Sequence, residues 1–85
     1  MNDVLYSLNL EITAYVYELH ELQQVIKDLA ADPDCDPVYM QEIGDRYMKL
    51  CDKLRIILEA YFAEEKNYDE PANFNYRKLY KQLVS

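Results

Sequence analysis

The sequence predicts an all-α protein: an antiparallel helical hairpin of two long heptad-patterned helices, followed by a short C-terminal helix. Two observations carry this prediction. Leucine, isoleucine and tyrosine recur at alternating intervals of three and four residues along two segments. The prolines fall between the predicted helices or in the first turn of one, and one glycine in 85 residues argues against a sheet with many tight turns. This length allows one small domain, covering residues 1–85.

The first helix is predicted over about residues 3–32. Either Asn2 or Asp3 can cap its start, and Pro33 cannot continue it. Its seam is unbroken over four heptads, which is typical of a helix that buries one stripe against a neighbour. The seam consists of Leu5, Leu8, Ile12, Tyr15, Leu19, Leu22, Ile26 and Leu29.

The second helix is predicted over about residues 37–67. Asp36 is the expected N-cap, with Pro37 in the first turn. Because only a few residues separate the two helices, they must reverse direction and pack antiparallel. The second seam consists of Met40, Ile43, Tyr47, Leu50, Leu54, Ile57 and Tyr61.

The third helix is predicted over about residues 73–84, after a loop at 67–75. Asn73 or Asn75 can cap it, and Asp69 is an earlier candidate just before Pro71. Its apolar residues share one face, so we expect this short helix to pack on the hairpin. That face consists of Tyr76, Leu79, Tyr80 and Leu83.

A second apolar stripe on the second helix predicts an oligomer. Each large apolar side chain left in water forfeits about 1.5–3 kcal/mol of burial free energy. The third helix can cover one end of the stripe, and a second copy of the hairpin can cover the rest, giving a four-helix-type bundle. We expect a homodimer, with a monomeric three-helix bundle and a hetero-complex as alternatives. The expected interface consists of Met48, Cys51, Leu58 and Phe62.

The net charge of -7 is confined to the first part of the chain. Residues 1–36 contain eight acidic residues and Lys27 as the single base, whereas residues 37–85 contain eight acids and eight bases. Two interpretations are open. The third helix can dock its bases, Arg77, Lys78 and Lys81, against the acidic helix, or a partner with a basic surface can be steered to it. In the second case the expected partner-binding residues are Glu11, Glu18, Glu21, Tyr6 and Tyr17.

Residue patterns for catalysis, cofactors and metals are weak. His20 is the single histidine and lies off the seam, and Cys35 and Cys51 are too few and too far apart for a zinc site. The aspartates at 32, 34 and 36 resemble the start of a calcium loop, but its glycine and terminal glutamate are missing. We therefore expect no enzyme activity, no cofactor and no metal.

No run of about 18 apolar residues predicts a membrane span. The N-terminal residues contain Asp3 and no base, which is unlike a secretory signal. We expect a cytoplasmic protein with free thiols at Cys35 and Cys51.

The sequence therefore favours a small acidic protein-binding module, acting as an inhibitor or adaptor through the first helix. By analogy of size and charge, such a module resembles phage anti-defence inhibitors, immunity-type inhibitors or nucleic-acid mimics. The alternative is a structural self-assembling oligomer or a secretion-type chaperone. The third interpretation is a weak nucleic-acid binder that uses the three basic residues of the C-terminal helix with Tyr76 and Tyr80. Three basic side chains make only a small positively charged surface for such binding.

Overall fold

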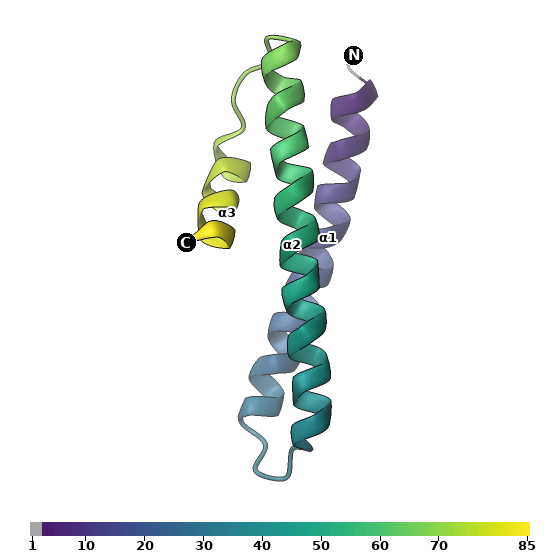
Figure 1. Ribbon diagram of the computed structural model, residues 1–85, viewed down its shortest axis with the longest axis vertical. Coiled ribbons are helices and arrows are strands. Elements are labelled where there is room, and N and C mark those ends of the chain that lie inside the picture. The colour runs from purple at the N-terminus through teal and green to yellow at the C-terminus, as the bar shows by residue number, and fades with distance from the viewer. Residues whose placement is uncertain (1–2) are drawn as a thin grey trace.

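The computed structural model describes residues 3–85 and places three helices in them: α1 (Asp3–Ala30), α2 (Pro37–Asn67) and α3 (Phe74–Val84). The long helices lie antiparallel along a body of 52 × 23 × 15 Å. Figure 1 shows α3 beside the half of the hairpin that lies away from the α1–α2 turn. The predicted all-α hairpin with a short third helix is confirmed. In the described part of the chain, no helix has both the length and the apolar character that a membrane span requires.

The α1–α2 seam forms the core. Every seam residue is buried or half-buried, and Ile12 and Leu54 are completely covered. Toward the end of α2 the core departs from the predicted pattern, because Ile57 is only half-buried and Leu58 is fully buried instead. A straight helix drifts by about 20° per heptad against a 3.5-residue repeat. Such a drift moves residues on the flank of the seam, such as Leu58, toward the buried side near the end of a long helix.

The end of α1 differs slightly from the prediction. The helix ends at Ala30, two residues before the expected boundary. The Asp32 N–H then bonds to the Leu29 carbonyl at 3.1 Å, a tighter turn than an α-helix makes. The cause is Pro33, which disfavours helical backbone in the residue before it. The proposed cap Asn2 lies outside the described residues.

The caps of the other two helices are confirmed. The Asp36 carboxylate accepts a hydrogen bond from the Val38 N–H at 2.9 Å, and the Asn73 side chain accepts one from the Tyr76 N–H at 3.1 Å. Each bond satisfies an N–H group that the first turn of the helix leaves without a partner. Asp69 is not a cap: its φ of 58° lies in the left-handed region, so it belongs to the turn that reverses the chain after α2.

One buried carboxylate attaches α3 to the hairpin. The side chain of Glu65 is only 3% exposed, and it accepts hydrogen bonds from the Asn73 N–H at 2.8 Å and from the Arg77 guanidinium at 3.2 Å. The Arg77 guanidinium also lies 4.7 Å from the centre of the Phe62 ring. A buried carboxylate needs such partners, because an unpaired buried charge is strongly destabilising.

Aromatic contacts complete the packing of α3. Tyr76 packs edge-on against Tyr61, with ring centres 5.0 Å apart, and Tyr80 packs edge-on against Phe62 at 5.6 Å. The Tyr80 hydroxyl donates a hydrogen bond to Glu59 at 2.8 Å. All three partners belong to α2, so α3 rests mainly on that helix.

The expectation that the bases of α3 dock on the acids of α1 is wrong. Arg77 pairs with Glu65 of α2, while Lys78 and Lys81 line a pocket on the α2 side of α3. Because the loop after α2 ties α3 to α2, its basic residues do not reach Glu11, Glu18 or Glu21. Within residues 3–85 these glutamates form no ion pair.

Replacing the single glycine tests the packing of α2. Gly44 lies inside the helix, and a Cβ atom there meets nothing within 4 Å. Since glycine costs a helix interior about 1 kcal/mol relative to alanine, Gly44→Ala is expected to raise the free energy of unfolding by that amount, with Tm rising by roughly 4–8 °C. Thermal melts followed by circular dichroism check this. Ala60→Gly, at an exposed site of the same helix, should lower Tm comparably, and a lower Tm for Gly44→Ala would contradict the packing.

Removing the buried carboxylate tests the attachment of α3. In Glu65→Ala the Asn73 N–H and the Arg77 guanidinium lose their acceptor, at a cost of about 1–3 kcal/mol. We expect amide hydrogen exchange to accelerate throughout α3 while α1 and most of α2 stay protected. Glu42→Ala removes the same charge from an exposed position and should leave α3 protected. Equal protection of α3 in both variants would show that Glu65 does not hold it.

Candidate partner-binding groove

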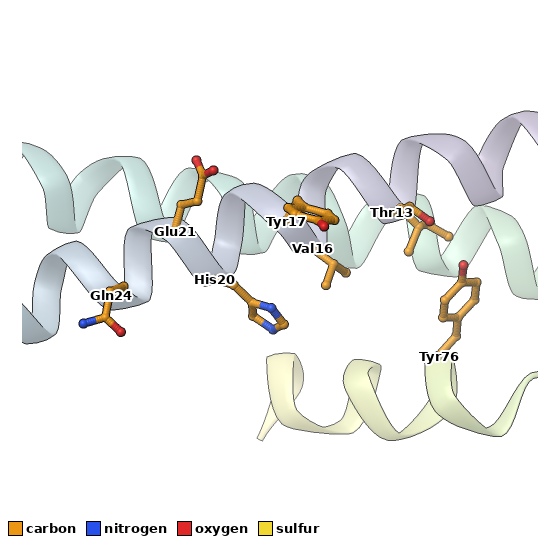
Figure 2. A pocket seen from close by; sticks show the side chains of 8 residues that line it. Thr13, Val16, Tyr17, His20, Glu21, Gln24 and Tyr76 are labelled. Atoms are coloured by element: carbon orange, nitrogen blue, oxygen red, sulfur yellow. The ribbon is translucent and has the colours of Figure 1, made fainter.

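An open groove of about 680 Å³ runs between α1 and α3. Figure 2 shows Val16 and His20 pointing from α1 toward α3, and Tyr76 pointing from α3 toward Thr13. The surface inside the groove is mainly apolar. We name this feature the α1 groove; it is lined by Ile12, Thr13, Val16, Tyr17, His20, Glu21, Gln24 and Tyr76.

The α1 groove follows from helix periodicity. Thr13, Val16, His20 and Gln24 are separated by three, four and four residues, so they form a stripe beside the buried seam. Val16 is half-buried against the core, whereas Tyr17 is 71% exposed. The groove exists because α3 rests on α2 and leaves this stripe of α1 uncovered.

Tyr76 closes one end of the α1 groove. Its hydroxyl donates a hydrogen bond to the Asn9 side chain and so links α3 to α1. Burial raises the pKa of the Tyr76 phenol, and a hydrogen bond with the Thr13 side chain acts in the opposite direction. The phenol is therefore neutral at physiological pH and fixes the distance between α1 and α3 at this point.

The acidic residues of α1 lie on different sides of the helix. Glu21 lines the α1 groove, and Figure 2 shows its carboxylate turned away from α3. Glu18 instead shares a small pocket of about 160 Å³ with Arg46, Lys49 and Lys53 of α2. The negative charge of Glu18 is thus partly offset by these nearby basic residues of α2. Glu21 instead faces solvent with no ion-pair partner among the described residues.

Only some of the predicted partner-binding residues line the α1 groove. Tyr17 and Glu21 line it, while Tyr6 and Glu11 are exposed nearer the start of α1. Sequence reasoning missed the contributions of Thr13, Val16, Gln24 and Tyr76, and it assessed His20 only as a ligand or base. The helical spacing of the α1 residues beside the seam was a usable signal. Nothing in the sequence indicated that Tyr76 would end the groove.

The predicted oligomer stripe is divided by α3. Leu58 is completely buried within the protomer, so it presents no surface to a second copy, and Phe62 is half-buried beneath Tyr80 and Arg77. Met48 is 63% exposed and Cys51 half-buried on the part of the stripe beyond α3. The surface left for a second copy is therefore narrower than predicted.

The side chains around the groove are mostly apolar or neutral hydrogen-bonding groups. Within residues 3–85 no group of three or more His, Cys, Asp or Glu side chains is placed to hold a metal ion. Both cysteines are free thiols, and burial raises the pKa of Cys51, which keeps its sulfur protonated and weakly nucleophilic. The groove thus offers apolar area, hydrogen-bonding groups and one exposed carboxylate.

Comparison with protein-family models, curated proteins and solved structures finds no significant match for this chain.

Alkaline pH tests the contact at the end of the groove. The raised pKa of Tyr76 means that the folded state holds the phenolic proton more strongly than the unfolded chain, whose tyrosines titrate near pH 10. Its contribution to stability is therefore fully present below about pH 10 and is lost as the pH rises through the raised pKa. The hydrogen bond that Tyr80 donates to Glu59 raises the pKa of Tyr80 in the same direction.

We accordingly expect urea midpoints to fall as the pH rises above about 10, and to fall less in Tyr76→Phe/Tyr80→Phe. Tyr39→Phe, at the exposed start of α2, should behave as the wild type. If the double variant loses as much stability as the wild type over this pH range, these two phenols do not anchor α3.

Proposed function

We propose that this chain is a non-catalytic protein-binding module that captures an amphipathic helix of another protein in the α1 groove. The observation that carries the proposal is the groove itself, an apolar channel of about 680 Å³ with Tyr17 exposed along it. Grooves of this kind bind the apolar face of a helix through residues spaced at i, i+3 or i+4, and i+7.

A helix suits the groove because two helices, α1 and α3, already line it and leave it open. Packed beside α1 and α3, a fourth helix would complete a four-helix arrangement and cover Val16 and Tyr17. Tyrosine in such a position supplies rigid contact area and a hydroxyl for hydrogen bonding, at little entropic cost.

The charge of the module favours a basic partner. Residues 1–36 contribute the whole net charge of -7, and Glu21 stands at the edge of the groove without an internal ion pair among the described residues. A lysine or arginine beside the apolar face of the partner helix would meet this carboxylate, and the wider field would accelerate encounter over a Debye length of about 8–10 Å. An inhibitor or adaptor role is consistent with this surface, including the occlusion of a nucleic-acid-binding channel in the partner.

Self-assembly is the second candidate function. It is supported by Met48, which remains exposed where the second stripe emerges from beneath α3, and it fits a homodimer, another helical oligomer or a secretion-type chaperone. We place either function in the cytoplasm, where the free thiols of Cys35 and Cys51 persist.

Photo-crosslinking in the native host tests capture at the α1 groove. A photoreactive residue at position 17 is expected to trap one discrete protein through a basic amphipathic helix, whereas the same residue at exposed position 39 on α2 is not. With the trapped protein purified, Glu21→Lys should weaken binding roughly tenfold at low salt, and added salt should weaken binding of the wild type. Glu42→Lys makes the same charge change on α2 and should have a much smaller effect.

Three outcomes would count against capture at the groove. The first is equal cross-linking from positions 17 and 39. The second is affinity that neither Glu21→Lys nor salt alters. The third is cross-linking at position 17 to a second copy of this chain alone, which would favour self-assembly.

A further inference from the structure

A second pocket lies on the other flank of α3, between α3 and α2. It encloses about 440 Å³, and its lining combines aromatic rings with bases. Phe74 is 80% exposed there, more than any other large apolar side chain in the described part of the chain. We name it the cationic pocket; it is lined by Phe62, Phe74, Arg77, Lys78, Tyr80 and Lys81.

Two positive charges of the cationic pocket have no counterion inside the protein. Arg77 is held by Glu65 and stacks on Phe62, so its charge is already compensated. Lys78 and Lys81 form no ion pair with any described residue. A ligand that fits must therefore bring carboxylates or other anionic groups next to an apolar contact for Phe74.

The same chain carries a complementary group at its opposite end. The turn between α1 and α2, together with the end of α1, has no base from residue 28 to residue 36. Asp36 caps α2 and Asp32 accepts the Asp34 N–H, but the Asp34 carboxylate accepts no hydrogen bond among the described residues. We name this segment the acidic turn, after Asp28, Asp32, Asp34 and Asp36.

The acidic turn cannot reach the cationic pocket of its own chain. Figure 1 shows the turn at one end of the long body, and α3 beside the other half. Because α3 is fixed there by Glu65 and by its aromatic contacts, any meeting of the two groups is intermolecular.

We propose that two copies form an antiparallel dimer in which the acidic turn of each copy docks on the cationic pocket of the other. A two-fold axis across the hairpins makes both contacts at once and closes the assembly, so no filament results. This pairing also sets the exposed half of the second stripe, with Met48 and Cys51, in the region where the two hairpins overlap. In the dimer, each copy then covers the part of the other copy's second stripe that α3 leaves exposed.

Charge identifies a second copy as the occupant. A nucleic acid would find Lys78 and Lys81, but it would be repelled by the -7 net charge, whereas another copy supplies four aspartates in one short turn. The contact does not involve the α1 groove, which opens on the other flank of α3. The dimer and the proposed capture of a partner helix are therefore tested separately.

Paired charge reversals make the test specific. Lys78→Glu/Lys81→Glu makes both the pocket and the turn acidic, and Asp28→Lys/Asp34→Lys cancels the net charge of the turn, because two lysines then stand beside Asp32 and Asp36. Neither substitution pair alters the caps Asp36 and Asn73. We expect each variant alone to dimerise at least roughly tenfold more weakly than the wild type, because the first variant opposes like charges at both contacts and the second removes the charge attraction from both. In an equimolar mixture the acidic turn of the first variant meets the basic pocket of the second, so one of the two attractive contacts is restored and the heterodimer should form more readily than either homodimer.

Sedimentation velocity over a range of concentrations, at low and high salt, measures these equilibria, and circular dichroism confirms that each variant is folded. Lys49→Glu/Lys53→Glu reverses two charges beside Glu18, away from the cationic pocket, and should leave dimerisation near that of the wild type. The proposal predicts a wild-type dimer that salt weakens and a mixture that dimerises more readily than either variant alone.

Three results would overturn the proposal. One is a wild type that stays monomeric at every concentration and salt. Another is a mixture of the two variants that stays as monomeric as its components. The third is a monomeric wild type that binds a single-stranded oligonucleotide and loses it in Lys78→Glu/Lys81→Glu, which would assign the pocket to nucleic acid.

Discussion

The buried carboxylate of Glu65 is the interaction on which the rest of this structure depends. It receives the Asn73 N–H at the start of α3 and the Arg77 guanidinium one turn later, so it sets both the position and the direction of the short helix. With α3 held against α2, one flank of α3 leaves the α1 groove open and the other forms the cationic pocket. Both candidate binding surfaces therefore depend on this buried pair, together with the aromatic contacts that hold α3 on α2.

The same interaction explains why the charges of the chain stay apart. Arg77 is compensated within the fold, which leaves Lys78 and Lys81 exposed on one flank. On α1, Glu18 lies near bases of α2, while Glu21 faces solvent at the edge of the groove. The protein thus presents separate acidic and basic surfaces at a distance from each other, and each surface suits a contact with another molecule.

Much of the fold was predictable because it follows from local chemistry. Apolar spacing defines the buried stripe of a helix without knowledge of its neighbour, and Asp36 and Asn73 cap helices through bonds to residues two or three positions away. The groove was predictable only in part. Tyr17 and Glu21 were identified as exposed residues of the first helix, but their grouping with Tyr76 depends on a contact across 67 residues of sequence between Tyr76 and Asn9.

The sequence by itself determined the three helices, the antiparallel seam, the Asp36 cap of α2 and the confinement of net negative charge to residues 1–36. Only the tertiary structure decided which flank of the hairpin α3 covers and that Glu65 is buried. It also decided that Arg77 pairs with a carboxylate of α2 rather than with one of α1. The physical reason is that periodicity reports which side of a helix is apolar, but not which element will cover it. A charged residue such as Glu65 reads as solvent-exposed until the donors that satisfy it are brought beside it by the fold.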